Sequence, residues 1–319
     1  MRAAVYTKYG SPEVVKLMEV EKPVPRETEI LVKVFASTVN RTDCGFRSAE
    51  YFISRLWSGL LHPRNKILGC EYAGQVEEIG SKVSLFKIGD RVFGYNDKKF
   101  GGHAEYVAVT ETDAITKIPD KLSYEEAAPI TEGAHYALCN IRASKIRKGH
   151  NALVYGATGA IGSAAVQLLK HMEVKVTAVC NTKNLELIKS LGVFEVIDYQ
   201  TQDFTKTETG FDFIFDAVGK SSFKICKPLL NNNGIYISTE LGKHAENIFL
   251  ALVIPLVGSK KVLCPIPSFK KEDLGYMKKP VETGGFRPII DRTYRLEEIV
   301  QAHEYVETGQ KTGNIVITI

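Results

Sequence analysis

The sequence has no paired cysteines, no block of like charges and no apolar run of membrane length. Its six cysteines stand singly, with no C-x-x-C pair, which argues against a disulfide framework and against a cysteine-rich structural zinc site. The 41 basic and 37 acidic residues are scattered along the chain and leave a net charge of only +4. The composition therefore gives no indication of a nucleic-acid partner.

The apolar segments are short as well. The longest, IFLALVIPLVG from Ile248, is about half of the ~20 residues that a membrane span needs, and it contains Pro255. We interpret it as buried or as a lid. The amino-terminal stretch carries Arg2, Lys8 and Glu13 where a secretory signal would be apolar. We therefore expect a cytoplasmic protein with no membrane partner.

The 319 residues, of which 44% are hydrophobic, suffice for a sizeable core divided between two domains. Up to about residue 125, short runs of alternating polarity predict antiparallel strands in a partly open barrel. After a helix capped by Ser123, strand-like and helix-like runs alternate, which predicts a doubly wound parallel sheet. The final runs, LEEIVQAHEYVETG and KTGNIVITI, predict a helix and a strand that returns to the first domain. The expected boundaries are 1–124, 125–265 and, for the returning segment, 266–319.

Three equally spaced glycines, Gly156, Gly159 and Gly162, lie between the strand-like NALVY and the helix-like SAAVQLLK. This setting predicts a Rossmann-type dinucleotide site, in which the first glycine permits the tight turn, the second admits the pyrophosphate, and the third lets helix and strand pack closely. The alternative is a sharp strand-to-helix turn with no ligand. The cofactor contacts expected from this turn are Gly156, Thr158, Gly159, Ala160, Ile161 and Gly162.

The end of the next strand, VCNTKN, indicates which dinucleotide is bound. A free ribose 2′-hydroxyl is usually held by an Asp or Glu about 20 residues past the glycines, and neither stands there. Lys183, with Asn181 and Thr182, suits a 2′-phosphate, so NADPH (NADP) is predicted over NADH. Alternatively, Lys183 is an ordinary solvated lysine.

Six motifs, spread over nearly the whole chain, resemble those of the medium-chain dehydrogenase/reductase superfamily. They are VNRTD (39–43), GCEYAGQVEEIGSKV (69–83), GDRVFGY (89–95), GGHAEYV (101–107), GATGAIG (156–162) and GFDFIFDAVG (210–219). Within it, the sequence is most similar to the zinc-free quinone and enone oxidoreductases, the zeta-crystallin-like branch. The resemblance implies a GroES-like β-barrel catalytic domain, a Rossmann NADP-binding domain and a substrate cleft between them. It also suggests a homodimer paired through Ser259–Pro267.

The resemblance also bears on a metal. In zinc-dependent alcohol dehydrogenases, a cysteine takes the position of Asn40, a histidine that of Cys70, and the third ligand falls near Pro129. Cys70 and the neighbouring Glu71 are the candidates that remain here, whereas catalytic zinc takes three protein ligands. No metal is therefore predicted, and we interpret Cys70 as a buried small hydrophobe.

Without a Lewis acid, hydride addition to an enone or a quinone is favoured over oxidation of a saturated alcohol. By resemblance, Asn40 lies beside the nicotinamide and Thr42 takes the place of a hydroxyl relay. Tyr51 falls in the loop that borders the substrate cleft, with a surface tyrosine as the alternative. Asp43 is expected to hold the turn, and His135 is not assigned a catalytic role.

The remaining cofactor contacts are carried over by position: Tyr199, Val218, Gly219, Leu241 and Asn314. Together these features predict an NADPH-dependent reductase of quinones or α,β-unsaturated carbonyls. Two rivals stay open. One is a zinc-dependent alcohol dehydrogenase, and the other is a nucleotide-binding scaffold or sensor with little turnover.

Overall fold

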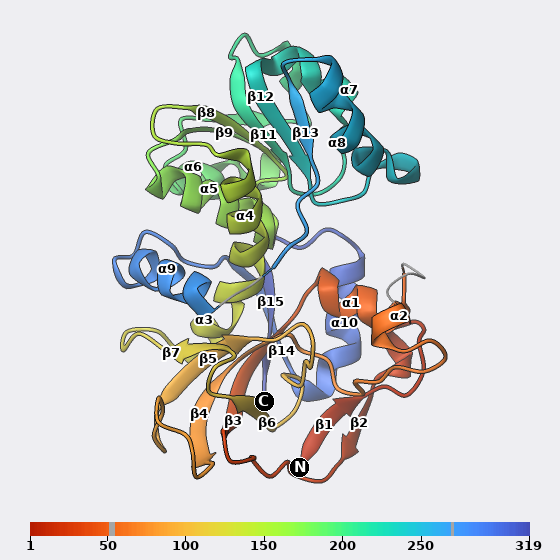
Figure 1. Ribbon diagram of the computed structural model, residues 1–319, viewed down its shortest axis with the longest axis vertical. Coiled ribbons are helices and arrows are strands. Elements are labelled where there is room, and N and C mark those ends of the chain that lie inside the picture. The colour runs from red at the N-terminus through yellow and green to blue at the C-terminus, as the bar shows by residue number, and fades with distance from the viewer. Residues whose placement is uncertain (51–54, 269–270) are drawn as a thin grey trace. The chain divides into compact units, whose positions relative to one another are not determined.

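The computed structural model describes residues 1–50, 55–268 and 271–319. The chain forms two compact units (Figure 1). The first contains Met1–Glu132, Phe269–Glu282 and Arg287–Ile319, and the second contains Gly133–Ser268 and Thr283–Phe286. The first change of unit falls at Glu132, later than the boundary expected at residue 124. The reason is that residues 124–130 pack against strands of the first unit.

A seven-stranded sheet forms the first unit. Its order is β14-β15-β3-β4-β5-β7, and β6 also pairs with β3. The strands are β3 (Glu29–Val39), β4 (Glu71–Ile79), β5 (Arg91–Tyr95), β6 (Tyr106–Thr110), β7 (Ala114–Lys117), β14 (Ile290–Arg295) and β15 (Asn314–Thr318). The last strand pairs antiparallel with β3, with Ile315 opposite Val39, so the predicted return of the chain end is confirmed.

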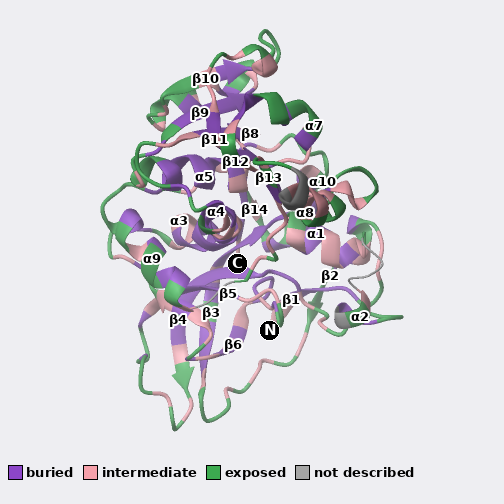
Figure 2. Ribbon diagram, turned by 45° about the horizontal axis from the view of Figure 1, so that its top comes forward, coloured by how far each residue is buried: buried purple, intermediate pink, exposed green. Residues whose placement is uncertain are grey.

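Short helices and a separate ribbon complete this unit. They are β1 (Arg2–Val5) paired with β2 (Lys16–Glu19), α1 (Arg41–Ser48), α2 (Arg55–Ser58), α3 (Tyr124–Ala127), α9 (Lys271–Glu282) and α10 (Ile299–Glu307). One buried cluster joins Val39, Cys44, Cys70, Ile299 and Ile315. It packs α1 and α10 against the sheet, whose strands β3 and β4 are largely buried (Figure 2).

A parallel sheet of order β10-β9-β8-β11-β12-β13 forms the second unit. Its elements are α4 (Thr131–Ser144), β8 (Asn151–Tyr155), α5 (Ala160–His171), β9 (Lys175–Cys180), α6 (Leu185–Ser190), β10 (Glu195–Asp198), β11 (Phe211–Asp216), α7 (Phe223–Cys226), β12 (Leu230–Ser238), α8 (Glu246–Val257) and β13 (Lys261–Leu263). The order reverses between β8 and β11, as in doubly wound sheets. The predicted Rossmann-type fold is confirmed.

The segment after Ser123 forms two helices instead of a continuous one. Ser123 caps α3 as predicted, and its hydroxyl accepts a hydrogen bond from the Glu126 backbone N–H at 3.2 Å. A 3₁₀ turn then spans Ala128–Ile130 and includes Pro129, and α4 begins at Thr131. Proline supplies no backbone N–H and clashes with the preceding turn, which accounts for the interruption.

The apolar run from Ile248 lies in α8, and one face of it is exposed. The exposed fractions are 45% for Ile248, 64% for Phe249 and 70% for Leu252. For these residues the buried interpretation was wrong, because burial of an apolar run requires a partner on every apolar face. Among the helices within the described ranges, none is long and apolar enough to cross a membrane.

Candidate active site

The glycine turn joins β8 to α5, and two of its glycines are required by the fold itself. Gly156 has a φ of +81°, and a Cβ there would lie 2.5 Å from the Val218 side chain. A Cβ on Gly162 would lie 2.1 Å from the Gly156 carbonyl oxygen. Real Cβ atoms do not approach another heavy atom so closely, and the φ of Gly156 is one that other residues rarely adopt, so both positions need glycine whether or not a ligand binds.

Gly159 is different, because no packing among the described residues explains it. It adopts ordinary extended backbone, with a φ of −71°, and it has no side chain that could cap α5. Among the described residues, a Cβ there would meet the Gly156 carbonyl oxygen alone, at 3.9 Å. Open space beside an uncapped helix start is what a diphosphate needs in order to reach the backbone N–H groups. The turn therefore fits a dinucleotide.

The other predicted contacts of this unit follow the carboxyl ends of neighbouring parallel strands. Asn181 and Tyr199 come directly after β9 and β10, and Val218 and Leu241 follow β11 and β12. Carboxyl ends of parallel strands share one edge of a sheet, where ligands bind. Gly219 has a φ of +64°, and a Cβ there would lie 2.2 Å from the Glu240 side chain, so this glycine is explained by the fold.

The region predicted for the 2′-phosphate holds a carboxylate that the sequence reasoning missed. Asp198 accepts hydrogen bonds from the Thr182 hydroxyl at 2.5 Å and from the Gln200 N–H at 3.0 Å. The Thr182 hydroxyl and the other hydrogen bonds hold the pKa of Asp198 below its usual value. Lys183, the residue after Thr182, is exposed, and Asp198 is only 5% exposed. The position of Asp198 at the end of the strand β10 was the sequence signal that could have indicated this carboxylate.

Asn314 lies in the first unit. It begins β15 and is 5% exposed, and its side-chain amide donates to the Ile289 carbonyl at 3.0 Å. The side chain thus fastens the segment before β14 to β15. Contact with a cofactor through this side chain stays a prediction.

Asn40 and Asp43 cap α1 reciprocally in the first unit. The Asn40 amide oxygen accepts from the Asp43 N–H at 3.0 Å, and its Nδ2 donates to the Cys70 sulfur at 3.0 Å. The Asp43 carboxylate accepts from the Asn40 N–H at 3.1 Å and from the Gly69 N–H at 2.9 Å. Burial raises the pKa of Asp43 to about 7. Asp43 holds the turn, as expected. Asn40 is 4% exposed, and its side chain stabilises the same turn.

Thr42 contacts a buried carboxyl that the sequence analysis did not single out. Its hydroxyl lies 3.0 Å from Oε1 of Glu132, and Thr42 itself is partly exposed whereas Glu132 is 3% exposed. Glu132 stands in the first turn of α4. An acidic residue within the apolar segment AAPITEGAHYAL was the available signal, because a charged side chain in such a segment is rarely buried without a partner.

Glu71 lies fully buried next to this pair and is well satisfied. Its Oε1 accepts from the Thr131 N–H at 2.9 Å, from the Thr131 hydroxyl at 2.7 Å and from the Glu132 N–H at 2.6 Å. Its Oε2 accepts from the Thr38 hydroxyl at 2.6 Å. Burial raises the pKa of Glu71, and these hydrogen bonds oppose the rise. Burial and the Glu71 charge raise the pKa of Glu132 to about 8.

Known proteins resemble the chain in sequence and in structure. Family models match the alcohol dehydrogenase GroES-like domain over residues 26–120 and zinc-binding dehydrogenase over residues 191–317. The chain is 32% identical to a 2-methylene-furan-3-one reductase of Solanum lycopersicum, over 99% of this chain and 79% of that protein. It is 30% identical to a chloroplast envelope quinone oxidoreductase homolog of Arabidopsis thaliana, over 99% of this chain and 98% of that protein.

A solved quinone oxidoreductase from Coxiella burnetii superposes with a TM-score of 0.87 at 28% identity, covering 100% of this chain and 99% of that one. The chain belongs to the medium-chain dehydrogenase/reductase superfamily. Within this superfamily it falls in the quinone and enone oxidoreductase branch. It is therefore an oxidoreductase of the medium-chain dehydrogenase/reductase type.

The description of one matched family mentions zinc, so we tested the donor set of this superfamily member. Asn40 offers an amide where zinc-dependent relatives have a cysteine, and burial raises the pKa of the Cys70 thiol far above its usual value. Within residues 1–50, 55–268 and 271–319, no group of three His, Cys, Asp or Glu side chains could hold a metal ion. These residues do not fit catalytic zinc.

Two further sequence-predicted features complete the placement. Tyr51 lies outside the described residues. His135 is 2% exposed and lies in α4, where its ring packs against that of Tyr136 at 5.1 Å between centroids.

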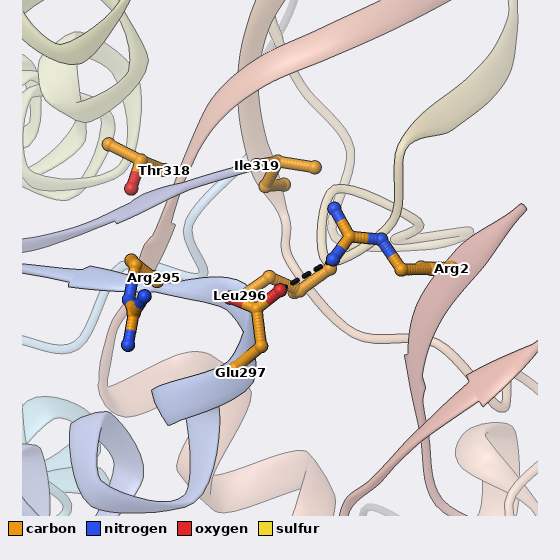
Figure 3. A pocket seen from close by; sticks show the side chains of 6 residues that line it. All are labelled: Arg2, Arg295, Leu296, Glu297, Thr318 and Ile319. Atoms are coloured by element: carbon orange, nitrogen blue, oxygen red, sulfur yellow. Dashed lines mark hydrogen bonds and ion pairs between the residues drawn. The ribbon is translucent and has the colours of Figure 1, made fainter.

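A surface pocket of the first unit is lined by Arg2, Arg295, Leu296, Glu297, Thr318 and Ile319 (Figure 3). None of these six lining residues is a predicted catalytic or cofactor-binding residue, so we do not connect this pocket with catalysis.

Proposed function

We propose that this oxidoreductase uses NADPH to reduce quinones or α,β-unsaturated carbonyls without a metal. The observation that carries the proposal is Gly159, which has open space beside its backbone at an uncapped helix start. The fold does not require glycine at this position, whereas a bound diphosphate would require the absence of a side chain there. The names of the relatives supply the substrate class, and one at 28% identity is named an NADPH-dependent alkenal/one oxidoreductase.

The residues of the second unit would hold the cofactor by its phosphates. Backbone N–H groups from Ala160 to Gly162 would bind the diphosphate, helped by the positive end of the α5 dipole. Thr182 and Lys183 would bind the 2′-phosphate, and the buried carboxylate of Asp198 orients the Thr182 side chain. When bound, NADPH would supply a hydride for the β-carbon of the substrate.

The first unit would stabilise the negative charge that follows. Hydride addition places charge on the carbonyl oxygen, where hydrogen-bond donors lower the barrier. Thr42 is the partly exposed donor in the predicted catalytic segment. Asn40 would act chiefly by fixing the start of α1, since its amide already bonds Asp43 and Cys70.

We also propose a homodimer that pairs β13 with its counterpart in a second copy. β13 ends the six-stranded sheet, and an edge strand offers unpaired backbone groups to another strand. Sedimentation at micromolar concentration tests this. We expect a wild-type dimer, and a wild-type monomer would refute the pairing.

The central test is a screen of NADPH oxidation with quinones, enones and simple aldehydes, run with and without a chelator. We expect turnover of at least one quinone or enone, unaffected by chelation. Chelator-sensitive oxidation of saturated alcohols would instead identify a zinc-dependent dehydrogenase. Tight NADPH binding with no turnover across the screen would favour a nucleotide-binding sensor.

A further inference from the structure

We infer that Glu132 supplies, through the hydroxyl of Thr42, the proton that completes reduction of the substrate. The inference rests on the proposed function, because it concerns the second half of an enone reduction. It assigns a proton source that the motifs alone do not reveal. Glu132 acts through Thr42 and is a positioning and proton-relay residue, whereas Thr42 is the group that would touch the substrate.

The first support is the arrangement of the two side chains. The Thr42 hydroxyl lies 3.0 Å from Glu132 Oε1, which is within hydrogen-bond range for proton transfer. Thr42 is partly exposed on α1, and Glu132 is 3% exposed behind it. The Glu132 carboxyl is thus kept from bulk water and is joined by a hydrogen bond to a partly exposed residue.

The second support is the unequal treatment of two adjacent carboxyls. Glu71 accepts four hydrogen bonds, two of them from backbone N–H groups at the start of α4, and these bonds favour its ionised form. In the described parts of the chain, the Glu132 carboxyl has one hydrogen bond, to Thr42. Paired carboxyls in unequal surroundings divide into one ionised group and one proton carrier.

The charged groups facing Glu132 come from two elements and one loop. Glu71 on β4 and Asp43 on α1 raise the pKa of Glu132, and Lys311, which follows α10, lowers it. Burial is the largest effect and acts in the same direction as the two carboxylates, so the pKa rises to about 8. Burial and the two carboxylates therefore favour the neutral form of Glu132 near pH 7. The Thr42 hydroxyl donates to Glu132 Oε1 at 3.0 Å, and rotation of the hydroxyl hydrogens would let a protonated Glu132 donate to the Thr42 oxygen instead.

The proton step balances as follows for an enone. Hydride adds to the β-carbon with its electron pair, and the enolate that results takes the Thr42 hydroxyl proton at its α-carbon. The Thr42 oxygen takes the Glu132 carboxyl proton as its own O–H bond breaks. Glu132 is left as a carboxylate, which the Lys311 charge stabilises, and it regains a proton from water.

The first experiment needs neither substrate nor cofactor. Infrared spectra of the protein at pH 7 and pH 10 are compared for wild type and Glu132→Gln. We expect a protonated carboxyl band in wild type that titrates near pH 8 and is missing from the variant. Spectra without such a Glu132-dependent band would overturn the inference whatever the enzyme does with substrate.

The second experiment follows enone reduction with saturating NADPH. Glu132→Gln should lower kcat by about 100-fold or more, the usual range for general acid catalysis, with little change in the KM for NADPH. Wild-type kcat should fall as the pH rises through about 8, and this limb should vanish in the variant. Unchanged kcat and pH profile in Glu132→Gln would overturn the inference while leaving the reductase activity standing.

Thr42 provides the matched control. Thr42→Ser keeps the hydroxyl and should keep most of the rate, whereas Thr42→Val removes it and should match Glu132→Gln. Because the two residues act in series, the double variant should be no slower than either single one. Additive losses would show that they act separately and would refute the relay. If wild type reduces no acceptor at all, the proposed function itself fails.

Discussion

The sharpest prediction concerns replacement of Gly159 by alanine. A Cβ at Gly159 has no atom of the described residues nearer than 3.9 Å, and its φ of −71° suits any residue. In the absence of cofactor, Gly159→Ala should therefore stay within about 1 kcal/mol of wild-type stability, since the restriction of the unfolded chain by alanine is offset by the poorer capping of α5 by alanine. Thermal denaturation of the cofactor-free protein measures this.

The same methyl group should weaken NADPH binding. It would fill the space through which the diphosphate reaches the backbone N–H groups of α5. Each hydrogen bond from a neutral donor to a charged group contributes about 1.5–3 kcal/mol, so loss of one bond corresponds to about 10- to 100-fold in affinity. Titration of NADPH followed by its fluorescence gives the dissociation constant.

Gly162 supplies the matched comparison in the same turn. A Cβ there would lie 2.1 Å from a backbone oxygen, so Gly162→Ala must displace the turn and should destabilise even the cofactor-free protein by about 1–3 kcal/mol, as in overpacked cores. Wild-type NADPH affinity in Gly159→Ala would refute our explanation of the open glycine. An equal loss of stability in both variants would refute the geometry of the turn.

Three other outcomes follow from the structure. Lys183→Ala should lower the preference for NADPH over NADH by about 10-fold or more, the effect of one charge-assisted contact, and an unchanged ratio of kcat/KM values would mean that this lysine is merely solvated. The His103 ring is fully buried and donates to the Thr38 carbonyl at 2.7 Å, and burial lowers its pKa to about 4. A histidine in the unfolded chain titrates near pH 6.5. The contribution of His103 to the free energy of unfolding is therefore complete above pH 6.5 and is lost as the pH falls toward 4, by about 3 kcal/mol in all. Urea unfolding between pH 7 and 4.5 should show a shallower pH dependence in His103→Gln, and parallel curves would contradict the assignment. Prolonged dialysis against a chelator should leave quinone reduction intact, as metal analysis before and after can verify.

The fold followed from the sequence wherever one pattern settled both the local structure and the packing. The alternation of KTGNIVITI predicted a strand in need of a partner, and β15 pairs with β3 in the first unit. The Ser123 capping signal was sound, because the N–H groups it satisfies are local. What the local pattern did not predict was the break at Pro129 and the exposure of α8, which depend on neighbours distant in the sequence.

The candidate site shows the same division between local and distant causes. The glycine turn was recognisable, because consecutive residues determine its backbone geometry. The pairing of Thr42 with Glu132 was not, since the two lie 90 residues apart and meet only in the folded first unit. Asn40 and Thr42 were assigned by resemblance to the family, and that resemblance gave no role to Glu132. A physical criterion would have found Glu132: a carboxyl amid apolar residues at a helix start must be paired, neutral, or both. Here Glu71 takes the helix N–H groups, and Glu132 is left beside it to carry the proton.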